Sequence, residues 1–183
     1  IDNIKSLCPD NHQVLGSLQY KNKEFYIDSF QFGSSNIKAP TFGLFAGVHG
    51  LEKIGTHIVL NFIESLINDM KWNKSLQATL EQIRIISIPM INPTGVCYNS
   101  RSNYRDVDLM RNAPIESDED PPSLVGGHYL SPKLPWYRGQ TNVLEKENQI
   151  LLDYIKENAF SSKLFMSLDI HSGFGIRDRL WYP

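Results

Sequence analysis

A histidine and a glutamate that could bind a metal ion lie close together in this sequence of 183 residues. His49 and Glu52 stand three positions apart, in a glycine-containing segment where a short apolar run gives way to a helical pattern. At such a strand-to-helix turn both side chains can converge on one point, and imidazole and carboxylate are both zinc ligands. Because Glu52 could instead favour the positive end of the following helix, the pair alone leaves both interpretations open.

A second histidine, His171, follows another apolar run and precedes Ser172 and Gly173. A lone histidine in this position is commonly a hydrogen-bonded structural residue. Together with His49 and Glu52, however, it completes a set of two imidazoles and one carboxylate, which leaves a fourth zinc position open for water. The wide separation of His171 from the other two also favours a catalytic site, because structural zinc sites more often use short ligand spacings.

A third polar segment lies between these two, in a stretch rich in proline, glycine, serine and asparagine. It begins with Asn92-Pro93-Thr94-Gly95, and Arg101, Arg105 and Arg111 follow beside two aspartates. Such a loop could be a salt-bridged surface. It could equally bind a carboxylate or an oxyanion, because the guanidinium fork matches carboxylate geometry.

The pattern of apolar and polar residues along the chain predicts the strands and helices that carry these side chains. Short apolar or alternating runs predict strands over 13–20, 24–32, 41–48, 83–91 and 164–170. Helical periodicity predicts helices over 53–70 and 143–158 and a short piece over 76–82, whereas 92–137 reads mostly as loop. The first of these helices has an apolar stripe through Ile54, Ile58 and Phe62. The alternation predicts an α/β fold: a mixed, largely parallel central sheet with helices on both faces.

Composition excludes several classes of protein. The formal net charge of −2, with scattered basic residues, gives no electrostatic case for a nucleic-acid partner or an anionic membrane. No run approaches the roughly 18 apolar residues of a membrane span. Cys8 and Cys97 could form one disulfide or remain free thiols. We therefore expect a soluble globular domain over residues 1–183, while its oligomeric state and its compartment, whether cytoplasmic, periplasmic or secreted, stay open.

Four motifs follow one another in a characteristic order: HxxE at 49–52, NPxG at 92–95, RxNxxxVDLxRN at 101–112 and DxHSG at 169–173. In this order they resemble the M14 zinc carboxypeptidase family. The Tyr137-Arg138-Gly139 segment, with Glu145 and Glu147 after it, is similar to a further passage of that family. The closer resemblance is to the bacterial branch with murein-peptide amidases, which apolar Leu51 favours; succinylglutamate desuccinylase and aspartoacylase are more distant.

The resemblance implies a single zinc ion held by His49, Glu52 and His171. It implies that Arg101 polarises the scissile carbonyl and stabilises the oxyanion. It also implies that Asp108 orients the first zinc histidine.

Three further residues are candidates for binding the substrate. Arg111 matches the family's clamp for the terminal carboxylate of the substrate, while Asn112 and Ser172 are candidate substrate contacts. Glu145 and Glu147 are expected to be structural, because a first helical turn favours acids in any case.

The sequence also departs from the family pattern. Met110 stands where the family usually has an asparagine that shares the clamp, and a thioether cannot donate that hydrogen bond. Ala113 replaces a usual aromatic residue. The family's general base is a glutamate well beyond the third ligand, but only Asp178 follows His171 here. We therefore expect residues 1–183 to be an incomplete catalytic domain whose polypeptide continues.

The resulting hypothesis is a zinc metallocarboxypeptidase of the EC 3.4.17 type. It would cleave an amide bond in a small peptide, with cell-wall peptides as one possibility, through water activated by zinc. One alternative is an acylamino-acid deacylase of the desuccinylase or aspartoacylase type. Another is a catalytically silent homologue that binds peptide or zinc, an interpretation that Met110 and the missing base motivate.

Overall fold

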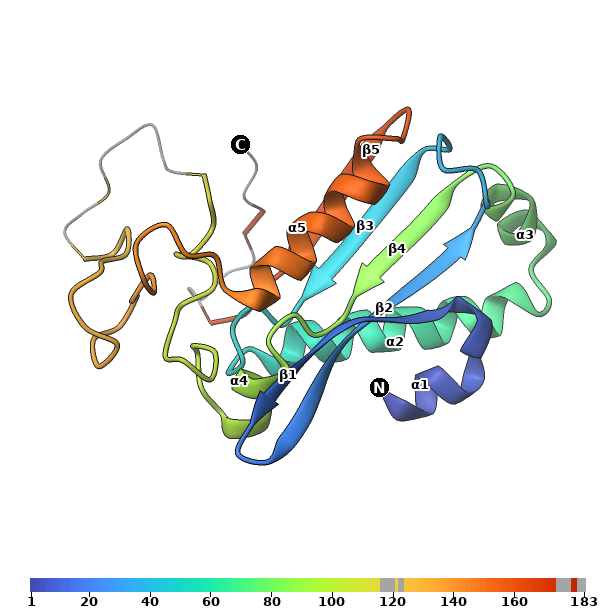
Figure 1. Ribbon diagram of the computed structural model, residues 1–183. Helices are drawn as coiled ribbons and strands as arrows, with labels where there is room; N and C mark the ends of the chain where they lie inside the picture. The colour runs from blue at the N-terminus through green and yellow to red at the C-terminus, as the bar shows by residue number, and fades with distance from the viewer. Residues whose placement is uncertain (116–120, 122–123, 174–178, 181–183) are drawn as a thin grey trace.

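A computed structural model describes residues 1–115, 121, 124–173 and 179–180. Its centre is one mixed sheet of five strands in the order β1-β2-β4-β3-β5 (Figure 1). The strands are β1 (His12–Tyr20), β2 (Lys23–Gly33), β3 (Thr41–Ala46), β4 (Arg84–Ile88) and β5 (Phe165–Ile170). The expected mixed α/β sheet is confirmed. Its parallel pairings join β4 to β3 and β3 to β5, while β1–β2 and β2–β4 are antiparallel. Asp178 lies outside the described residues.

The register of the parallel strands brings distant segments to one edge. Ala46 at the end of β3 pairs with Ile170 at the end of β5, and Phe45 pairs with Ile88 at the end of β4. Because parallel strands place their carboxyl ends at the same edge, the segments that follow all three strands start side by side. Both candidate metal-binding histidines belong to such segments.

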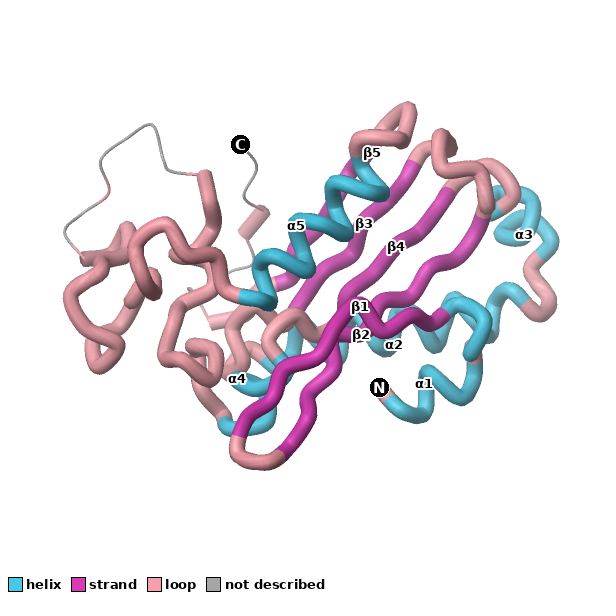
Figure 2. The backbone as a smooth tube through the Cα atoms, viewed as in Figure 1, coloured by secondary structure: helices cyan, strands magenta, loops and turns pink. Residues whose placement is uncertain are grey.

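Helices cover both faces of this sheet, as Figure 2 shows. They are α1 (Asp2–Leu7), α2 (Lys53–Met70), α3 (Lys74–Leu80), α4 (Pro93–Tyr98) and α5 (Lys146–Ala159), with a short 3-10 turn η1 (Pro9–Asn11). The prediction of a helix over 53–70 is confirmed, and α5 begins three residues later than predicted. The prediction of loop was wrong for α4. There the side chain of Asn92 caps the helix by accepting a hydrogen bond from the Gly95 N–H at 2.8 Å, and Pro93 opens it.

Each face of the sheet has its own apolar core. On one face α1, α2 and α3 pack against β2, β3 and β4 through Ile4, Cys8, Phe30, Phe32, Leu44, Ala46, Val59, Ile63, Leu66, Ile67, Leu80 and Ile85. On the other face α5 packs through Tyr154, Ile150 and Ile155 against Leu18, Ile27, Phe45, Ile86 and Ile88. Strands β3 and β4 are buried on both sides, and most of their residues are apolar; the buried polar residues are Thr41, Arg84 and Ser87.

The outer side of α2 differs from the sequence expectation. The stripe through Ile54, Ile58 and Phe62 is exposed, with 63%, 47% and 37% of each residue accessible, whereas the neighbouring stripe that includes Val59 and Ile63 is buried. The adjoining edge strand β5 is also largely exposed. The periodicity identified the apolar side of α2 correctly. The sheet covers the stripe with Val59 and Ile63 and leaves Ile54, Ile58 and Phe62 exposed.

Two smaller questions from the sequence are answered by the fold. Cys8 and Cys97 are both free thiols, Cys8 buried and Cys97 exposed, so they form no disulfide with each other. Among the helices in the described part of the chain, none is both long and apolar enough to traverse a bilayer.

Candidate metal centre

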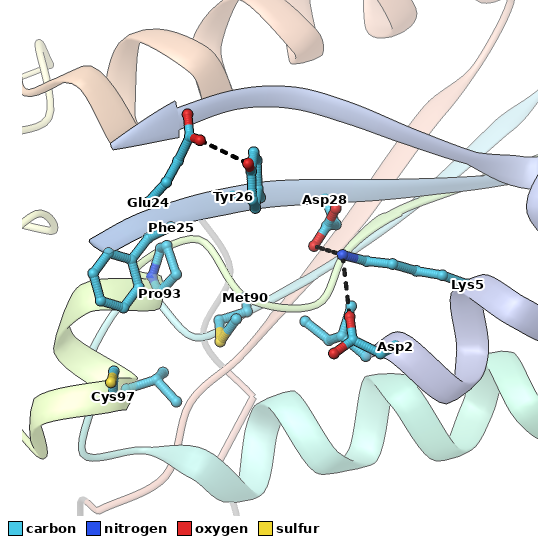
Figure 3. Close-up of a pocket in the computed structure, with 11 residues that line it drawn as sticks. Asp2, Lys5, Glu24, Phe25, Tyr26, Asp28, Met90, Pro93 and Cys97 are labelled. Atoms are coloured by element: carbon cyan, nitrogen blue, oxygen red, sulfur yellow. Dashed lines mark hydrogen bonds and ion pairs between the residues drawn. The ribbon is translucent and has the colours of Figure 1, made fainter. Parts of the chain in front are cut away.

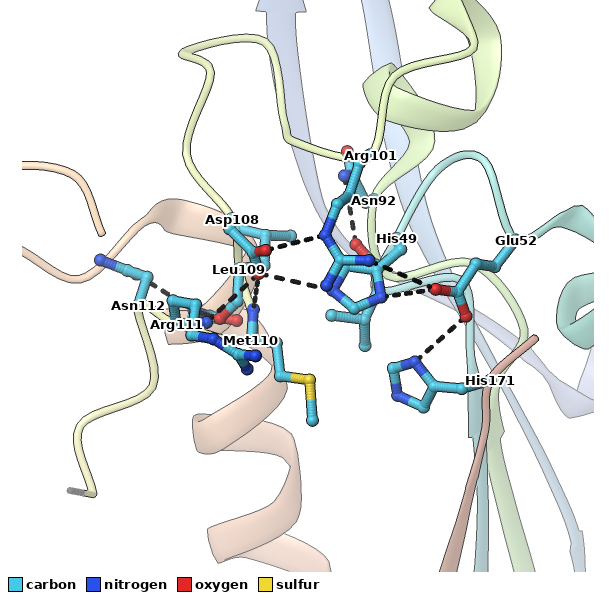
Figure 4. A network of polar contacts seen from close by, with 12 residues as sticks. His49, Glu52, Asn92, Arg101, Asp108, Leu109, Met110, Arg111, Asn112 and His171 are labelled. Atoms are coloured by element: carbon cyan, nitrogen blue, oxygen red, sulfur yellow. Dashed lines mark hydrogen bonds and ion pairs between the residues drawn. The ribbon is translucent and has the colours of Figure 1, made fainter. Parts of the chain in front are cut away.

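Three side chains from different elements meet at the carboxyl edge of the sheet (Figure 4). His49 follows β3, Glu52 is the residue before the first turn of α2, and His171 directly follows β5. One ligand atom from each lies within 4.8 Å of the others. His49 Nδ1 lies 2.9 Å from Glu52 Oε1, and His171 Nδ1 lies 3.3 Å from Glu52 Oε2. The structure thus brings together all three residues that the sequence singled out as metal ligands.

Two glycines allow the chain to turn so tightly after β3. Gly47 has a φ of +72°, in the left-handed region that side chains disfavour. Gly50 passes directly against α4, since a Cβ there would lie only 2.0 Å from the carbonyl carbon of Gly95. The Gly50 N–H also donates to the carbonyl oxygen of Arg101 at 3.3 Å. The turn that carries His49 is therefore packed between α4 and the Arg101 loop.

The second nitrogen of each histidine is held by an aspartate. His49 Nε2 lies 3.4 Å from Asp108 Oδ1, and His171 Nε2 lies 2.7 Å from Asp169 Oδ2. A carboxylate on one ring nitrogen fixes the tautomer and the ring orientation, and leaves the other nitrogen to a metal. Sequence reasoning anticipated Asp108 through the resemblance but assigned no role to Asp169. The signal was available, because residues two apart on a strand share a face.

Glu52 is the bridge of the site. Its Oε2 also accepts a hydrogen bond from the Ser172 N–H at 2.6 Å, and its Oε1 lies 3.6 Å from the Arg101 guanidinium. Burial opposes ionisation of Glu52, but hydrogen bonds with His171, His49 and the Ser172 N–H outweigh it and hold its pKa well below the usual range. The contact that Ser172 makes here is with a candidate ligand, through its backbone.

The charges around the histidines suit a cation. Hydrogen bonds to Asp169 and then Glu52 raise the pKa of His171 to about 10. Burial lowers the pKa of His49, but hydrogen bonds with Asp108 and Glu52 reverse this and raise it overall. The carboxylates thus attract positive charge to both rings. A divalent ion could take the place of these protons, so the donor set of two Nδ1 atoms and a carboxylate fits zinc.

Arg101 reaches into the site from its loop and is about one-third exposed. Its Nε donates to Asp108 Oδ2 at 2.9 Å. Burial opposes ionisation of Asp108, yet His49 and Arg101 lower its pKa to about 2. Asp108 therefore remains a carboxylate and holds both a candidate ligand and the arginine.

Arg111 is linked to the same centre through its backbone. Asp108 Oδ1 accepts hydrogen bonds from the N–H groups of Met110 at 3.1 Å and Arg111 at 3.3 Å. The Arg111 side chain is half-buried and donates through Nε to the Val125 carbonyl at 2.7 Å. Met110 beside it is exposed. Asp108 thus fixes where the Arg111 turn stands relative to His49.

The side chain of Asn112 is held by hydrogen bonds within the protein. It is buried, and its Nδ2 donates to the carbonyls of Arg138 and Val143 at 2.8 and 2.9 Å. Its Oδ1 accepts from the Glu145 N–H and from Asn148 Nδ2 at 2.8 and 3.0 Å. Both amide donors and both acceptor positions are used by the protein. Asn112 therefore fastens the loop to α5, and its contact with a substrate stays a prediction.

A pair of buried glutamates lies beneath this loop. Glu145 and Glu147 are 1% and 0% exposed, and Asn103 Nδ2 donates to an oxygen of each, at 3.0 and 3.3 Å. Burial raises the pKa of Glu147 to about 7. Their structural role, expected from the sequence, is supported by this complete burial.

The three candidate ligands and their neighbours define a class of metal site. Two histidines and one glutamate, with a carboxylate behind each histidine and Arg101 beside the glutamate, are the parts of a mononuclear zinc site of the hydrolytic type. A family model described as "Zinc carboxypeptidase" matches residues 11–176. The chain belongs to the zinc carboxypeptidase family.

One relative is similar to this chain in sequence, and two solved structures are similar to it in fold. Carboxypeptidase M of Mus musculus is 32% identical over a match that covers 41% of this chain and 19% of that protein. The carboxypeptidase A of Helicoverpa armigera has a TM-score of 0.70 at 20% identity, over 95% of this chain and 44% of that one. A metallo-carboxypeptidase of Burkholderia cenocepacia has a TM-score of 0.62 at 16% identity, over 94% and 40%. This chain spans less than half the length of each of these relatives.

Proposed function

We propose that this chain binds one zinc ion through His49, Glu52 and His171 and carries the zinc-ligand part of a peptidase active site. The observation that supports this most directly is that both Nδ1 atoms converge on Glu52 while Asp108 and Asp169 hold the opposite nitrogens. Bound there, zinc would supply a Lewis acid and would lower the pKa of a water molecule. Residues 1–183 would then form one portion of a single catalytic domain.

Arg101 is the proposed electrophilic residue of the chain. Its guanidinium lies beside Glu52 and is oriented through Nε by Asp108. A donor fixed in this way can stabilise negative charge that develops on a scissile carbonyl oxygen without reorganising during the reaction. We expect Arg101 to contribute more to turnover than to the binding of peptide.

Arg111 is the proposed residue for the free carboxylate of a peptide. A guanidinium can take a carboxylate through two parallel hydrogen bonds. The neighbouring Met110 is exposed and has no donor to add. We therefore propose a clamp with one arginine, weaker than a clamp that an asparagine would share.

The general base is proposed to come from outside these residues. The carboxylates in contact with the two histidines are Glu52, Asp108 and Asp169, and each is engaged with a ring nitrogen. Because the chain spans less than half of the relatives compared above, we place the base in additional polypeptide. Given a base, the preferred activity is removal of a residue from a small peptide, with cell-wall peptides as a candidate substrate.

A silent homologue that binds zinc or peptide is the second candidate. Met110 at the clamp favours it, because a thioether cannot supply the hydrogen bond that an asparagine would give to the carboxylate. An assay of short-peptide hydrolysis, made with the longest form of the protein, separates the two candidates. Hydrolysis supports the peptidase, and binding without hydrolysis supports the silent homologue.

The direct test of the proposed metal site is metal content. Purified protein dialysed against zinc and then against metal-free buffer should retain about one zinc per chain, and His49→Ala should retain much less. The exposed His57 on α2 provides a matched control, because His57→Ala should retain as much zinc as the wild type. Less than about 0.2 zinc per wild-type chain, with no effect of His49→Ala, would contradict the proposal.

A further inference from the structure

The segment that carries Asp108 is fastened at both ends to the start of α5. At one end, Asn103 Nδ2 donates to Glu145 Oε2 at 3.0 Å and to Glu147 Oε2 at 3.3 Å. At the other end, Asn112 Oδ1 accepts from the Glu145 N–H at 2.8 Å. Asp108, the aspartate behind the first candidate ligand, lies between these two attachments. The start of α5 therefore sets where Asp108 stands relative to the metal centre.

The side chain of Asn103 also closes the turn that leads to Asp108. Its Oδ1 accepts from the Arg105 N–H at 2.9 Å and from the Val107 N–H at 3.1 Å. Asn103 and Val107 are 2% and 1% exposed, so both fixed points of the turn are buried. Arg101 shortly precedes Asn103 and donates through Nε to Asp108 at 2.9 Å. A displacement of Asn103 would therefore move both Asp108 and Arg101.

The two glutamates that hold Asn103 are buried at a cost in free energy. Arg105 lies 3.5 Å from Glu145 Oε1, but its side chain is 42% exposed. Glu147 makes no ion pair with a described residue, and its Oε1 has no hydrogen-bond partner among them. Burial raises the pKa of Glu147 to about 7, so the acid is protonated below that pH. A buried acid pair of this kind commonly contributes less to stability than apolar residues of similar size would.

Another buried carboxylate of the chain has different surroundings. Asp28 lines a cavity of about 280 Å³ beside α1 (Figure 3) and is 4% exposed. Lys5 Nζ lies 2.9 Å from one of its oxygens, and His12 Nε2 lies 2.8 Å from the other. Both oxygens of Asp28 thus have a basic partner, whereas the Oε2 atoms of the two glutamates share an uncharged amide. The glutamates therefore fix the direction of a hydrogen-bonding group, Asn103 Nδ2, and do not serve to neutralise a cation there.

We propose that Glu145 and Glu147 are positioning residues of the metal centre, which act through Asn103. The two glutamates fix Asn103, and Asn103 fixes the turn between Arg101 and Asp108. This inference rests on the proposed function, in which the three candidate ligands bind zinc. Displacing the carboxylate behind a zinc-binding histidine weakens the metal site by about tenfold or more. The fixed geometry of Asp108 is what offsets the cost of burying the two acids.

The test compares an acceptor with an apolar side chain at position 147. Glu147→Gln keeps an oxygen that can accept from Asn103 and resembles the uncharged acid, whereas Glu147→Leu has no acceptor. Zinc affinity is measured on the 183-residue protein by competition with a chromophoric chelator, and the visible spectrum of bound cobalt(II) reports the ligand geometry. Glu147→Leu should weaken zinc about tenfold and alter the cobalt spectrum, whereas Glu147→Gln should stay within about twofold of the wild type.

A second variant tests the route through Asn103. Asn103→Ala removes the shared donor and should also weaken zinc about tenfold. Because both changes break the same connection, the double variant with Glu147→Leu should be within about threefold of Asn103→Ala alone. Val59→Ala, in the core on the opposite face of the sheet, is the matched control. It should lower the melting temperature and leave the zinc affinity within about twofold of the wild type.

The outcomes separate this inference from the proposed function. A wild type that retains less than about 0.2 zinc per chain contradicts both. If the wild type binds zinc and either Glu147→Leu or Asn103→Ala binds it equally well, the positioning role is wrong while the zinc site stands. The role is also wrong if Glu147→Gln loses as much affinity as Glu147→Leu, or if Val59→Ala loses as much as either. Thermal melting of each variant shows whether it is folded under the conditions of the titration.

Discussion

The two halves of the metal centre stand in different surroundings. His49 follows a strand in the middle of the sheet, and the side chains of His49 and Asp108 are 3% and 0% exposed. His171 follows the edge strand β5, and the side chains of His171 and Asp169 are 31% and 43% exposed. The inner half is fixed by packing against α4 and the Arg101 loop. The outer half depends on polar contacts with Glu52 and Asp169.

This difference indicates how the site is built. A buried half can present a ligand in a fixed position before a metal arrives, whereas an exposed half needs the metal, or further packing, to hold it. Glu52 contacts both histidines and joins the halves. Strand β5, which leads into His171, is itself largely exposed, as is the outer stripe of α2.

Removing the two histidines should give equal effects on zinc and unequal effects on folding. His49→Ala and His171→Ala should each weaken zinc binding at least about a hundredfold, because each removes a ligand. With zinc chelated, His49→Ala should lower the free energy of unfolding by roughly 2 kcal/mol, since Asp108 loses a buried partner. His171→Ala should cost less than His49→Ala under the same conditions, because the carboxylate of Asp169 beside it is partly exposed to solvent. Competition with a chromophoric chelator and urea unfolding measure the two effects; equal losses of folding energy would break the comparison.

The two orienting aspartates should differ in the same direction. Asp108→Asn should weaken zinc binding by up to about a hundredfold, and Asp169→Asn by about tenfold, within the range known for groups that orient a ligand. Asp108 has the larger expected effect because it also holds Arg101 and the N–H groups of Met110 and Arg111. Zinc titrations of both variants check this order, and the reverse order would contradict it.

The sequence predicted the positions of the ligands better than their surroundings. Apolar runs that end in glycine turns were enough to expect His49 and His171 at the ends of neighbouring strands. The orienting role of Asp169 was missed, although its spacing of two residues from His171 is a signal in the sequence. The four hydrogen bonds of Asn112 could not be predicted from the sequence, because their partners come from distant segments.

The fold was predictable to a similar degree. The periodicity of 53–70 gave the correct bounds for α2. It could not tell which of two adjacent apolar stripes is buried, because the neighbouring strands decide that, and so Ile58 proved exposed. Helix α4 was missed because Asn92 and Pro93 are common both in loops and at helix starts.

The pair of buried glutamates should also confer a pH dependence on stability, through Glu147. Burial raises its folded pKa to about 7 from an ordinary 4.5, so its contribution to stability is fully present below about pH 4.5 and is lost as the pH rises through about 7. The loss should reach roughly 2 kcal/mol, and Glu147→Gln should remove it. Urea unfolding between pH 4.5 and 8 measures the difference between wild type and variant. A difference that does not change with pH would be inconsistent with the buried acid pair.

The outer half of the metal centre should show a pH dependence of its own. Without metal, the folded pKa of His171 is about 10 against an ordinary 6.5, because Asp169 and Glu52 hold the proton. Its contribution to stability is therefore present below about pH 6.5 and is lost as the pH rises toward 10. The chelated protein should lose stability gently over this range relative to His171→Gln. Identical pH profiles for the two proteins would mean that the outer half is not held by these carboxylates.

The most direct test of the account is X-ray absorption at the zinc edge on the zinc-loaded protein. If His49, Glu52 and His171 hold the ion, the spectrum shows one zinc with two imidazole nitrogens and carboxylate or water oxygens at about 2.0–2.2 Å. His171→Ala then loses one of the two imidazoles. A sulfur ligand near about 2.3 Å, or a spectrum unchanged by removing either His49 or His171, would contradict it.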